Sequence, residues 1–175
     1  MTTDSIELFN SSLSGLAWKF QVNPSSCGNH EHYENYIRLM ALTDQQSGKG
    51  TTHVFVRRTE TTEEILGYIT LRATSYTQII GGKVYGNPAL EIFELAVKED
   101  AEGNHIGTEL VKFALATAFD LNGTTLGIQY VTLCADQQAV PFYEKLKFGR
   151  LDEQGEIPRE QWNENCVPMF LRLLI

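Results

Sequence analysis

The feature that most constrains the fold of this chain is a strand–turn–helix pattern between Leu90 and Asn122. Its first part, Glu91 to Lys98, is rich in apolar residues and is predicted to form a β-strand. A short polar loop follows, and apolar residues then recur at helical spacing from Ile106 to Leu121. The backbone N–H groups at the start of such a helix, together with the helix dipole, can bind an anion. A tight turn without any ligand would give the same pattern, because many α/β proteins join a strand to a helix through glycine.

Length and composition predict one domain over residues 1–175. Hydrophobic residues make up 42% and charged residues 21%, as in ordinary globular proteins rather than disordered ones. No apolar run approaches the roughly 20 residues that span a bilayer. The first ten residues carry acidic side chains and no basic segment, which argues against a secretory signal. We therefore expect a cytoplasmic protein without a membrane partner.

The net charge is −8 and the sequence pI is near 5.0. Such a balance repels nucleic acid on average, so nucleic acid is not expected as a partner, and it favours a cationic or neutral one. The cysteines fit neither a metal motif nor a disulfide framework, which indicates a reducing compartment. They are Cys27, Cys134 and Cys166. Cys134 lies in an apolar strand pattern and is predicted to be a buried small hydrophobe.

No metal site is predicted, because the histidines have no metal-ligand spacing. They are interpreted as surface residues and are His30, His32, His53 and His105.

Shorter patterns predict the other elements. Strands are expected at Ser5–Phe9, Leu16–Val22, His53–Arg58, Ile65–Tyr76, Ile128–Ala135, Phe148–Leu151 and Cys166–Leu173, and helices at His30–Thr43 and Gln137–Lys147. Gly67 is predicted to mark a bulge. The Gly-rich stretch Thr77–Pro88 is interpreted as an irregular insertion, either a binding loop or a linker. The order predicts an α/β fold whose mixed sheet is antiparallel in its first half.

Two motifs fall within and after the strand–turn–helix pattern. The first is EGNHIGTEL, residues 102–110, and the second is AVPFYEKLKF, residues 139–148. Together with the preceding EIFELAV, they resemble the GNAT superfamily of acyl-CoA-dependent N-acyltransferases. The resemblance is close over residues 91–151. It implies a GNAT-like fold, with a central mixed, mostly antiparallel, splayed sheet flanked by helices.

The chain departs from the family pattern at three positions. In the first motif the family has Gln or Arg, two residues, Gly, one residue, then Gly or Ala. Gly107 matches the last of these, whereas Glu102 and His105 replace the others. In the second motif, A-x-x-F-Y-E-x-x-G-F, Lys147 replaces the glycine. Glu102 places a negative charge beside an expected dianion, and His105 adds a Cβ where close backbone approach usually requires glycine.

The resemblance implies that acetyl-CoA is the cofactor. Backbone groups near Ala96 and Val97 would pair with the pantetheine arm, and amides of residues 103–108 would cradle the pyrophosphate. The cofactor-binding residues that it implies are Leu95, Ala96, Val97, Glu102, Gly103, Asn104, His105, Ile106, Gly107, Thr108, Asp136 and Phe142.

Acyl transfer to an amine needs a base, an oxyanion donor and an acid for the departing thiolate. The resemblance assigns Tyr143 as the acid, the Val97 N–H as the donor, and Glu91, with water, as the base. Glu94 is the competing carboxylate, as a base, a substrate contact or a solvent-facing charge. Glu91 and Glu94 are three residues apart and are expected on opposite faces of the strand. Asp136 either binds a cationic amine or caps the following helix.

These features predict an N-acetyltransferase that acts on a primary amine of a small cationic molecule or a peptide. One alternative is a toxin that acetylates aminoacyl-tRNA and is paired with an antitoxin, as in similar family members. The other is a non-catalytic acyl-CoA-binding module. Exposed strand edges near the C-terminus permit a homodimer without requiring one.

Overall fold

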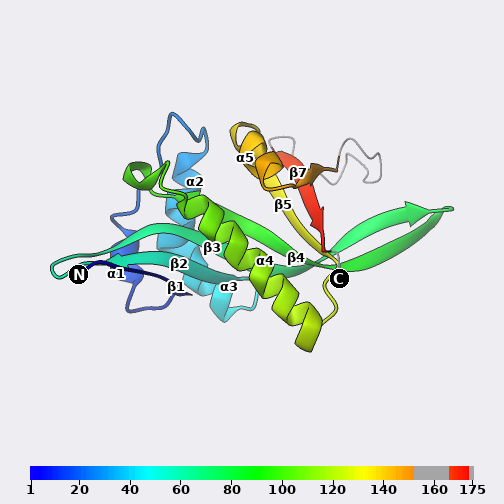
Figure 1. The fold of residues 1–175 in the computed structure, drawn as a ribbon, viewed down its shortest axis with the longest axis horizontal. Coiled ribbons are helices and arrows are strands. Elements are labelled where there is room, and N and C mark those ends of the chain that lie inside the picture. The colour runs from blue at the N-terminus through cyan, green and yellow to red at the C-terminus, as the bar shows by residue number, and fades with distance from the viewer. Residues whose placement is uncertain (152–165, 174–175) are drawn as a thin grey trace. The chain divides into compact units, whose positions relative to one another are not determined.

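Seven strands form one hydrogen-bonded sheet in the order β1-β2-β3-β4-β5-β7-β6 (Figure 1). The computed structural model describes residues 1–151 and 166–173. β4 and β5 pair in parallel, and the pairs β1–β2, β2–β3, β5–β7 and β6–β7 are antiparallel. The predicted mixed, mostly antiparallel sheet flanked by helices is therefore confirmed. The loop predicted between Leu151 and Cys166 lies outside the described residues.

The element bounds are as follows. The strands are β1 Thr3–Leu8, β2 Thr51–Arg58, β3 Glu63–Ile80, β4 Lys83–Val97, β5 Tyr130–Asp136, β6 Gly149–Arg150 and β7 Cys166–Arg172. The α-helices are α1 Ser14–Ala17, α2 His30–Asn35, α3 Ala41–Gln46, α4 Ile106–Thr124 and α5 Val140–Lys145. Three short helices complete the set: the π-helix η1 Tyr36–Met40 and the 3₁₀ helices η2 Glu99–Ala101 and η3 Gln137–Ala139.

The chain divides into two compact units, which are described separately. The first unit comprises Met1–Arg72 and Phe93–Phe113, and the second comprises Ala73–Ile92 and Ala114–Ile175. The single domain expected from length stays a prediction.

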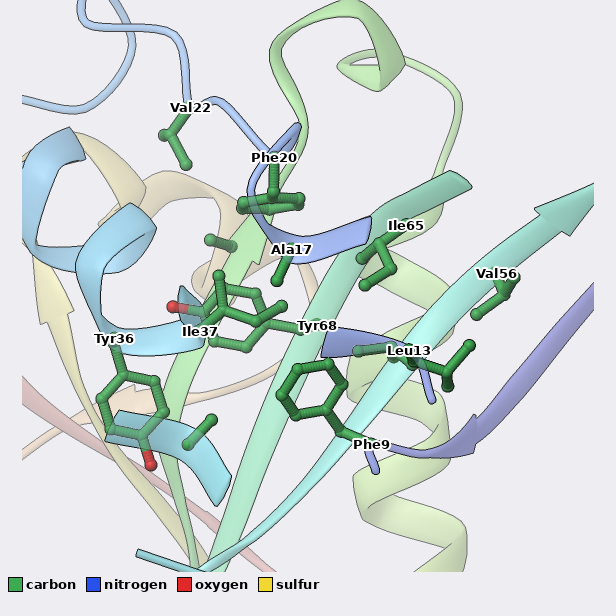
Figure 2. Close-up of a cluster of buried hydrophobic side chains, with 13 residues drawn as sticks. Phe9, Leu13, Ala17, Phe20, Val22, Tyr36, Ile37, Val56, Ile65 and Tyr68 are labelled. Atoms are coloured by element: carbon green, nitrogen blue, oxygen red, sulfur yellow. The ribbon is translucent and has the colours of Figure 1, made fainter. Parts of the chain in front are cut away.

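The core of the first unit lies between its helices and the strands β2, β3 and β4 (Figure 2). Its buried side chains include Phe9, Leu13, Ala17, Phe20, Val22, Tyr36, Ile37, Val56, Ile65 and Tyr68. Tyr68 is fully buried, and its hydroxyl donates a hydrogen bond to the Tyr33 carbonyl at 2.9 Å. Its ring meets Phe20 edge to face at 5.5 Å. Large aromatic rings therefore fill this core, and the polar end of Tyr68 is hydrogen-bonded there.

The strand predicted at Leu16–Val22 is wrong. The chain there forms α1, followed by tight turns in which the Phe20 N–H donates to the Ala17 carbonyl. The carbonyls of Ala17 and Phe20 accept from the Arg38 guanidinium, and Arg38 pairs with Glu34 at 3.1 Å. Of the alternating apolar residues that suggested a strand, Phe20 and Val22 are core residues carried by an irregular segment, whereas Trp18 is exposed.

The helix predicted at His30–Thr43 exists, but it is not regular. α2, η1 and α3 follow one another without a gap, and the middle part, Tyr36–Met40, is π-helical. A π-turn inserts an extra residue and rotates the side chains that follow. Tyr36 and Ile37 are buried as a result of this register, whereas Leu39 and Met40 remain exposed.

The stretch Thr77–Pro88 is not the irregular insertion that its glycines suggested. It is the distal part of a long hairpin made by β3 and β4, which run side by side to their turn (Figure 1). Gly81 and Gly82 form the turn with φ of +58° and +76°. Two successive positive φ values are the signature of a type I′ turn, which matches the twist of the flanking strands. The glycines therefore mark a turn and not a flexible loop.

Gly67 marks a bulge in β3, as predicted. The pairing runs Phe55↔Gly67 and then Val56↔Ile65, so one residue of β3 is skipped. A Cβ at Gly67 would lie 2.9 Å from Ile106 Cγ2 and 3.1 Å from the Ala96 carbonyl oxygen. Glycine at this position lets the start of α4 and the end of β4 approach β3 closely.

The second unit contains a small aromatic core. Tyr76, Ala89, Tyr130 and Leu151 are buried there, and Phe170 packs against them. Tyr76 stacks on Phe170 with the ring centroids 5.7 Å apart.

A disulfide joins Cys134 to Cys166, with the Cα atoms 5.5 Å apart. The predictions of no disulfide and of a buried Cys134 were therefore wrong, because Cys134 is exposed. The antiparallel register pairs Cys134 with Pro168 and Asp136 with Cys166, which puts the two cysteines diagonally opposite one another. Nothing in the spacing of the cysteines along the sequence reveals that register.

Candidate active site

β4 carries both candidate carboxylates. Burial alternates along its second half, with Ile92, Glu94 and Ala96 buried and the residues between them partly exposed. This alternation is expected for a strand whose successive side chains point to opposite faces, which separates Glu91 from Glu94. Glu94 is only 6% exposed, so a charge there needs a partner.

The end of β4 orients the Val97 amide. The Lys98 N–H donates to the Leu66 carbonyl at 2.8 Å, so the backbone of Lys98 faces β3. Backbone N–H groups of neighbouring residues in a strand point to opposite edges. The Val97 N–H therefore points away from β3, as required for an oxyanion donor on that edge of β4.

A tight turn leads from η2 into α4, which begins at Ile106 as the sequence predicted. Gly103 and His105 have φ of +78° and +61°, so two of the three consecutive residues 103–105 adopt the left-handed backbone conformation. The first-turn N–H groups of α4, which include those of residues 106–108, have no intrahelical acceptor and point out of the helix N-terminus. The turn therefore presents converging amides at the positive end of the helix dipole.

Glu102 is held by the N-terminal segment of the chain. Asn23 Nδ2 and Ser26 Oγ donate to its two carboxylate oxygens at 3.2 Å and 2.5 Å. The Glu99 N–H also donates to the Gln21 carbonyl, at 2.8 Å. We call the interaction of Glu102 with Asn23 and Ser26 the Glu102 clasp. Because both oxygens accept hydrogen bonds, the charge expected to oppose a phosphate at this turn is partly offset.

The second motif is a helix C-cap. The Phe148 N–H donates to the Tyr143 carbonyl at 3.1 Å and the Lys147 N–H to the Glu144 carbonyl at 3.0 Å. These two bonds define a Schellman motif, in which Lys147 occupies the left-handed position that usually holds glycine. The Tyr143 and Phe148 rings meet edge to face at 5.8 Å, which is the apolar contact that accompanies this motif.

The two departures from glycine in the sequence motifs share one conformation. His105 and Lys147, with φ of 61° and 72°, are the non-glycine residues of positive φ in residues 1–151 and 166–173. A left-handed backbone costs a residue with a Cβ about 1 kcal/mol. Both turns therefore keep the geometry that glycine would adopt, at some cost in stability.

The remaining predicted residues lie in the second unit. Tyr143 is 6% exposed in α5, whose first turn contains Pro141 as predicted, and its ring meets Phe142 at 4.9 Å. Asp136 is the N-cap residue of η3 but makes no side-chain cap hydrogen bond. Glu91 belongs to the same unit. Glu94, residues 95–97 and the turn at residues 102–108 are brought together in the first unit.

His32 lies at the candidate site, which the sequence did not reveal. Its Nε2 lies 2.8 Å from Glu94 Oε1, and its side chain is 48% exposed while that of Glu94 is 7% exposed. Sequence reasoning placed all four histidines at the surface. The Glu94 contact depends on how α2 packs on β4, which no local pattern reports. His53 also departs from that prediction: it packs on the Phe113 ring, and burial lowers its pKa.

Aromatic rings lie beside the His32 ring of the His32–Glu94 pair. The His32 ring lies 5.3 Å from Tyr33 and 6.5 Å from Tyr36, and Tyr36 meets Phe93 at 5.9 Å. Burial raises the pKa of Tyr36 and that of Tyr68, and negative charge adds to the increase, from Asp44 and Glu94 for Tyr36 and from Glu94 for Tyr68.

In the part of the chain that the structure describes, no group of three or more metal-ligating side chains could hold a metal ion. Within the same residues, no helix is both long enough and apolar enough to cross a membrane.

Comparison with known proteins gives a family match. The model of the Acetyltransferase (GNAT) family matches residues 15–148. No curated protein matches the chain.

Several solved structures share the fold. A tyrosine-to-phenylalanine mutant of the AtaT toxin, bound to acetyl-CoA and the C-terminus of the antitoxin AtaR, has a TM-score of 0.72 at 18% identity, over 97% of this chain and 92% of that one. A tyrosine-to-phenylalanine mutant of KacT has a TM-score of 0.75 at 17% identity, over 97% and 94% of the two chains. AtaT complexed with acetyl-methionyl-tRNAfMet has a TM-score of 0.76 at 17% identity, over 97% and 95%.

Proposed function

Because the chain belongs to the GNAT acetyltransferase family, we propose that it moves the acetyl group of acetyl-CoA directly to a primary amine of a small cationic molecule or a peptide. The observation that carries this proposal is the geometry of the first unit. There the Val97 N–H points away from β3, and a turn of converging amides follows within a few residues.

The residues present fit the cofactor. The backbone edge at residues 95–97 would hold the pantetheine arm, and amides of residues 103–108 would hold the pyrophosphate. The Glu102 clasp supports this assignment, because Asn23 and Ser26 engage the carboxylate that would otherwise face the phosphates. The His105 imidazole stands at the same turn and can add positive charge when it is protonated.

The chain supplies three functions to the transfer. The Val97 N–H donates a hydrogen bond to the acetyl oxygen, where negative charge develops. Glu91, with water, or Glu94 removes a proton from the amine nitrogen as its bond to the acetyl carbon forms. Tyr143 donates a proton to the sulfur as the C–S bond breaks. An ammonium substrate loses two protons in all, one to the thiolate and one to solvent. Acetyl-CoA itself supplies an acetyl group activated as a thioester.

Replacement of the proposed acid tests the mechanism. Tyr143→Phe is expected to bind acetyl-CoA normally and to lose about 100-fold or more in turnover, which is the usual contribution of a general acid. Release of the CoA thiol across a panel of primary amines measures turnover, and calorimetry measures binding. Tyr85→Phe, which alters an exposed tyrosine in the hairpin, is the matched control. A wild-type protein that binds acetyl-CoA but acetylates no amine would remove the proposal.

A toxin that acetylates aminoacyl-tRNA is the second candidate. Its support is that AtaT, a fold neighbour, is complexed with acetyl-methionyl-tRNAfMet in one structure and with its antitoxin AtaR in another. The expectation that nucleic acid is not a partner therefore lacks support, although the net charge of −8 still opposes it. Faster acetylation of aminoacyl-tRNA than of amino acid amides, with growth arrest that Tyr143→Phe relieves, would favour the toxin.

A non-catalytic acyl-CoA-binding module is the remaining alternative, suggested by the departures at Glu102 and His105. Acetyl-CoA at 100 times its Kd should stabilise the protein by about 2.7 kcal/mol in either case. Binding without turnover, unchanged by Tyr143→Phe, would favour the module.

A further inference from the structure

We propose that His32 and Glu94 form a carboxylate–imidazole pair that takes the proton from the acceptor amine, within aromatic surroundings that select an amine with an apolar substituent. This inference rests on the proposed acetyl transfer and deepens it. It assigns a catalytic role to His32, which the family pattern does not mark, and it gives Glu94 rather than Glu91 the role of the carboxylate behind the base.

The first support is the burial of Glu94. It is one of four buried polar or charged residues among those that the structure describes, and its Oε1 lies 2.8 Å from His32 Nε2. With Glu94 ionised, its oxygens only accept hydrogen bonds, and Nε2 is then the donor in this contact. The lone pair of the neutral ring is then at Nδ1. A carboxylate that orients an imidazole in this way also stabilises the imidazolium that forms when Nδ1 takes a proton.

The second support is the difference in exposure across the pair. The Glu94 side chain is 7% exposed and that of His32 is 48% exposed. The carboxylate is therefore inside and the basic ring lies at the surface, where an amine can reach it. A purely structural ion pair would contribute little to stability in this arrangement, because water screens the attraction between the two charges when one partner is exposed.

The third support is the set of side chains around the pair. Tyr33 and Tyr36, next to His32 in the chain, meet its ring, and Phe93, next to Glu94, meets Tyr36. The Arg72 guanidinium lies over the Phe93 ring at 3.8 Å. The titratable or charged groups on the packed elements include Tyr33, Tyr36, Tyr68, Arg72 and Glu94, and Asp44 and Cys27 act electrostatically on Tyr36 and Tyr68, respectively. Tyr36 is buried and Arg72 covers the Phe93 ring, so the partly exposed Tyr33 is the ring beside His32 that a substrate can reach. Aromatic rings attract both apolar groups and cations, which suits an ammonium that carries an apolar substituent.

The position of the pair along β4 is suitable for the reaction. Glu94 precedes Val97 by three residues, which is on the order of 10 Å along a strand. Glu94 and the proposed oxyanion donor therefore belong to one strand, and His32 in α2 belongs to the same unit.

The proton balance is as follows. His32 Nδ1 takes one proton from the ammonium form and passes it to solvent. It takes the second as the nitrogen bonds to the acetyl carbon and the C–S bond breaks, while Tyr143 donates a proton to the leaving sulfur. Transfer of the second proton from His32 to solvent, and of one from solvent to Tyr143, restores the enzyme. The net release is one proton for each ammonium acetylated.

The test compares pH profiles of kcat/KM for the full-length wild type, His32→Gln, Glu94→Gln and the control His30→Gln. His30 lies in the same helix, about 200° around it from His32. We expect His32→Gln to lose about 100-fold or more and to lose the acid limb of the profile, because a general base contributes on that scale. Glu94→Gln should lower kcat/KM in the same way, and His30→Gln should match wild type. His32→Gln is expected to fold, since its side chain is half exposed.

Chemical rescue separates a proton acceptor from a structural residue. In His32→Ala, added imidazole should restore at least about tenfold in kcat/KM, and it should leave His30→Ala unchanged. An acid limb that survives in His32→Gln, with acetyl-CoA binding intact, overturns the inference while the proposed function stands.

A binding measurement distinguishes failure of the inference about His32 from failure of the proposed acetyl transfer. The His32 ring proton resonances should shift with 2-phenylethylamine and not with its N-acetyl derivative. If the wild type acetylates no amine, the proposed function fails, and the resonances decide the inference. No shift then overturns it, and a shift with the amine alone supports the pair as an amine site.

Discussion

Two residues keep a glycine-like backbone without being glycine. His105 and Lys147 have left-handed φ at the positions where the family pattern has glycine. Strained residues persist where the surrounding hydrogen bonds fix the chain, and here the Schellman bonds fix Lys147. The sequence showed the departures, but only the backbone shows that the turns themselves are retained.

Lys147→Gly is expected to raise the free energy of unfolding by about 1 kcal/mol, because glycine adopts positive φ without a Cβ penalty. Lys145→Gly is the matched control. It removes the same side chain two residues earlier, at the last position of α5, and should destabilise by up to about 1 kcal/mol. Denaturant unfolding of both variants measures the difference. Loss of stability in Lys147→Gly would contradict this account of the cap.

Glu94 shows how far residue type alone can be interpreted. The sequence identified it as one of two candidate bases but left solvent exposure as an alternative. The structure buries it and pairs it with His32, which had no distinguishing pattern. A tertiary contact between α2 and β4 is set by packing over 62 residues of sequence separation, and no local rule contains it.

At the scale of elements, sequence patterns predicted correctly the features that are determined by interactions between residues close together in the chain. The β4–α4 segment, the bulge at Gly67 and the position of Pro141 were confirmed, because strand periodicity, glycine and proline act over a few residues. The strand predicted at Leu16–Val22 was wrong, because Arg38, far along the chain, donates hydrogen bonds to the carbonyls of an irregular segment. The irregular insertion predicted at Thr77–Pro88 was wrong, because its glycine pair was interpreted as a sign of flexibility. The pair instead forms a hairpin turn with two positive φ values.

The bulge at Gly67 lets three elements meet, and it makes a prediction about their packing. Gly67→Ala should lower the free energy of unfolding by about 1–3 kcal/mol, since its Cβ would lie 2.9 Å from Ile106 Cγ2, 3.0 Å from Leu110 Cδ1 and 3.1 Å from the Ala96 carbonyl. The carbonyl belongs to β4 and cannot move alone.

Gly15→Ala is the control for that experiment. It makes the same change in α1, with nothing within 4 Å of the added Cβ, and should be neutral or stabilising by up to about 1 kcal/mol. Thermal and denaturant unfolding compare the two. Equal effects of both substitutions would show that close approach at Gly67 is not what the glycine provides.

At the scale of the whole chain, the Cys134–Cys166 disulfide closes a loop that contains α5 and Tyr143. A cross-link between residues 32 apart lowers the conformational entropy of the unfolded chain. In the loop-entropy model this stabilises the folded state by about 3–4 kcal/mol. The sequence suggested free thiols, because the pairing depends on the register of β5 against β7.

Reduction should therefore lower the melting temperature of the wild type by roughly 5–15 °C. Cys134→Ser should melt at the lower temperature and no longer respond to reductant. Cys27→Ser changes the free cysteine and should respond as the wild type does. Thermal unfolding with and without a thiol reductant checks all three proteins. An identical melting temperature for the reduced and oxidised wild type would show that the cross-link adds nothing to stability.

The type I′ turn at Gly81–Gly82 has a consequence for how this protein can vary. In a two-stranded arm the pleat repeats every two residues, and the turn alone fixes which residues face each other. Removing or adding two residues on both β3 and β4 leaves all the remaining side chains on their original faces of the hairpin. A change of one residue moves the side chains beyond it to the opposite face. The reach of this hairpin is therefore an adjustable length, which can grow or shrink in paired steps while the fold behind it keeps its sequence.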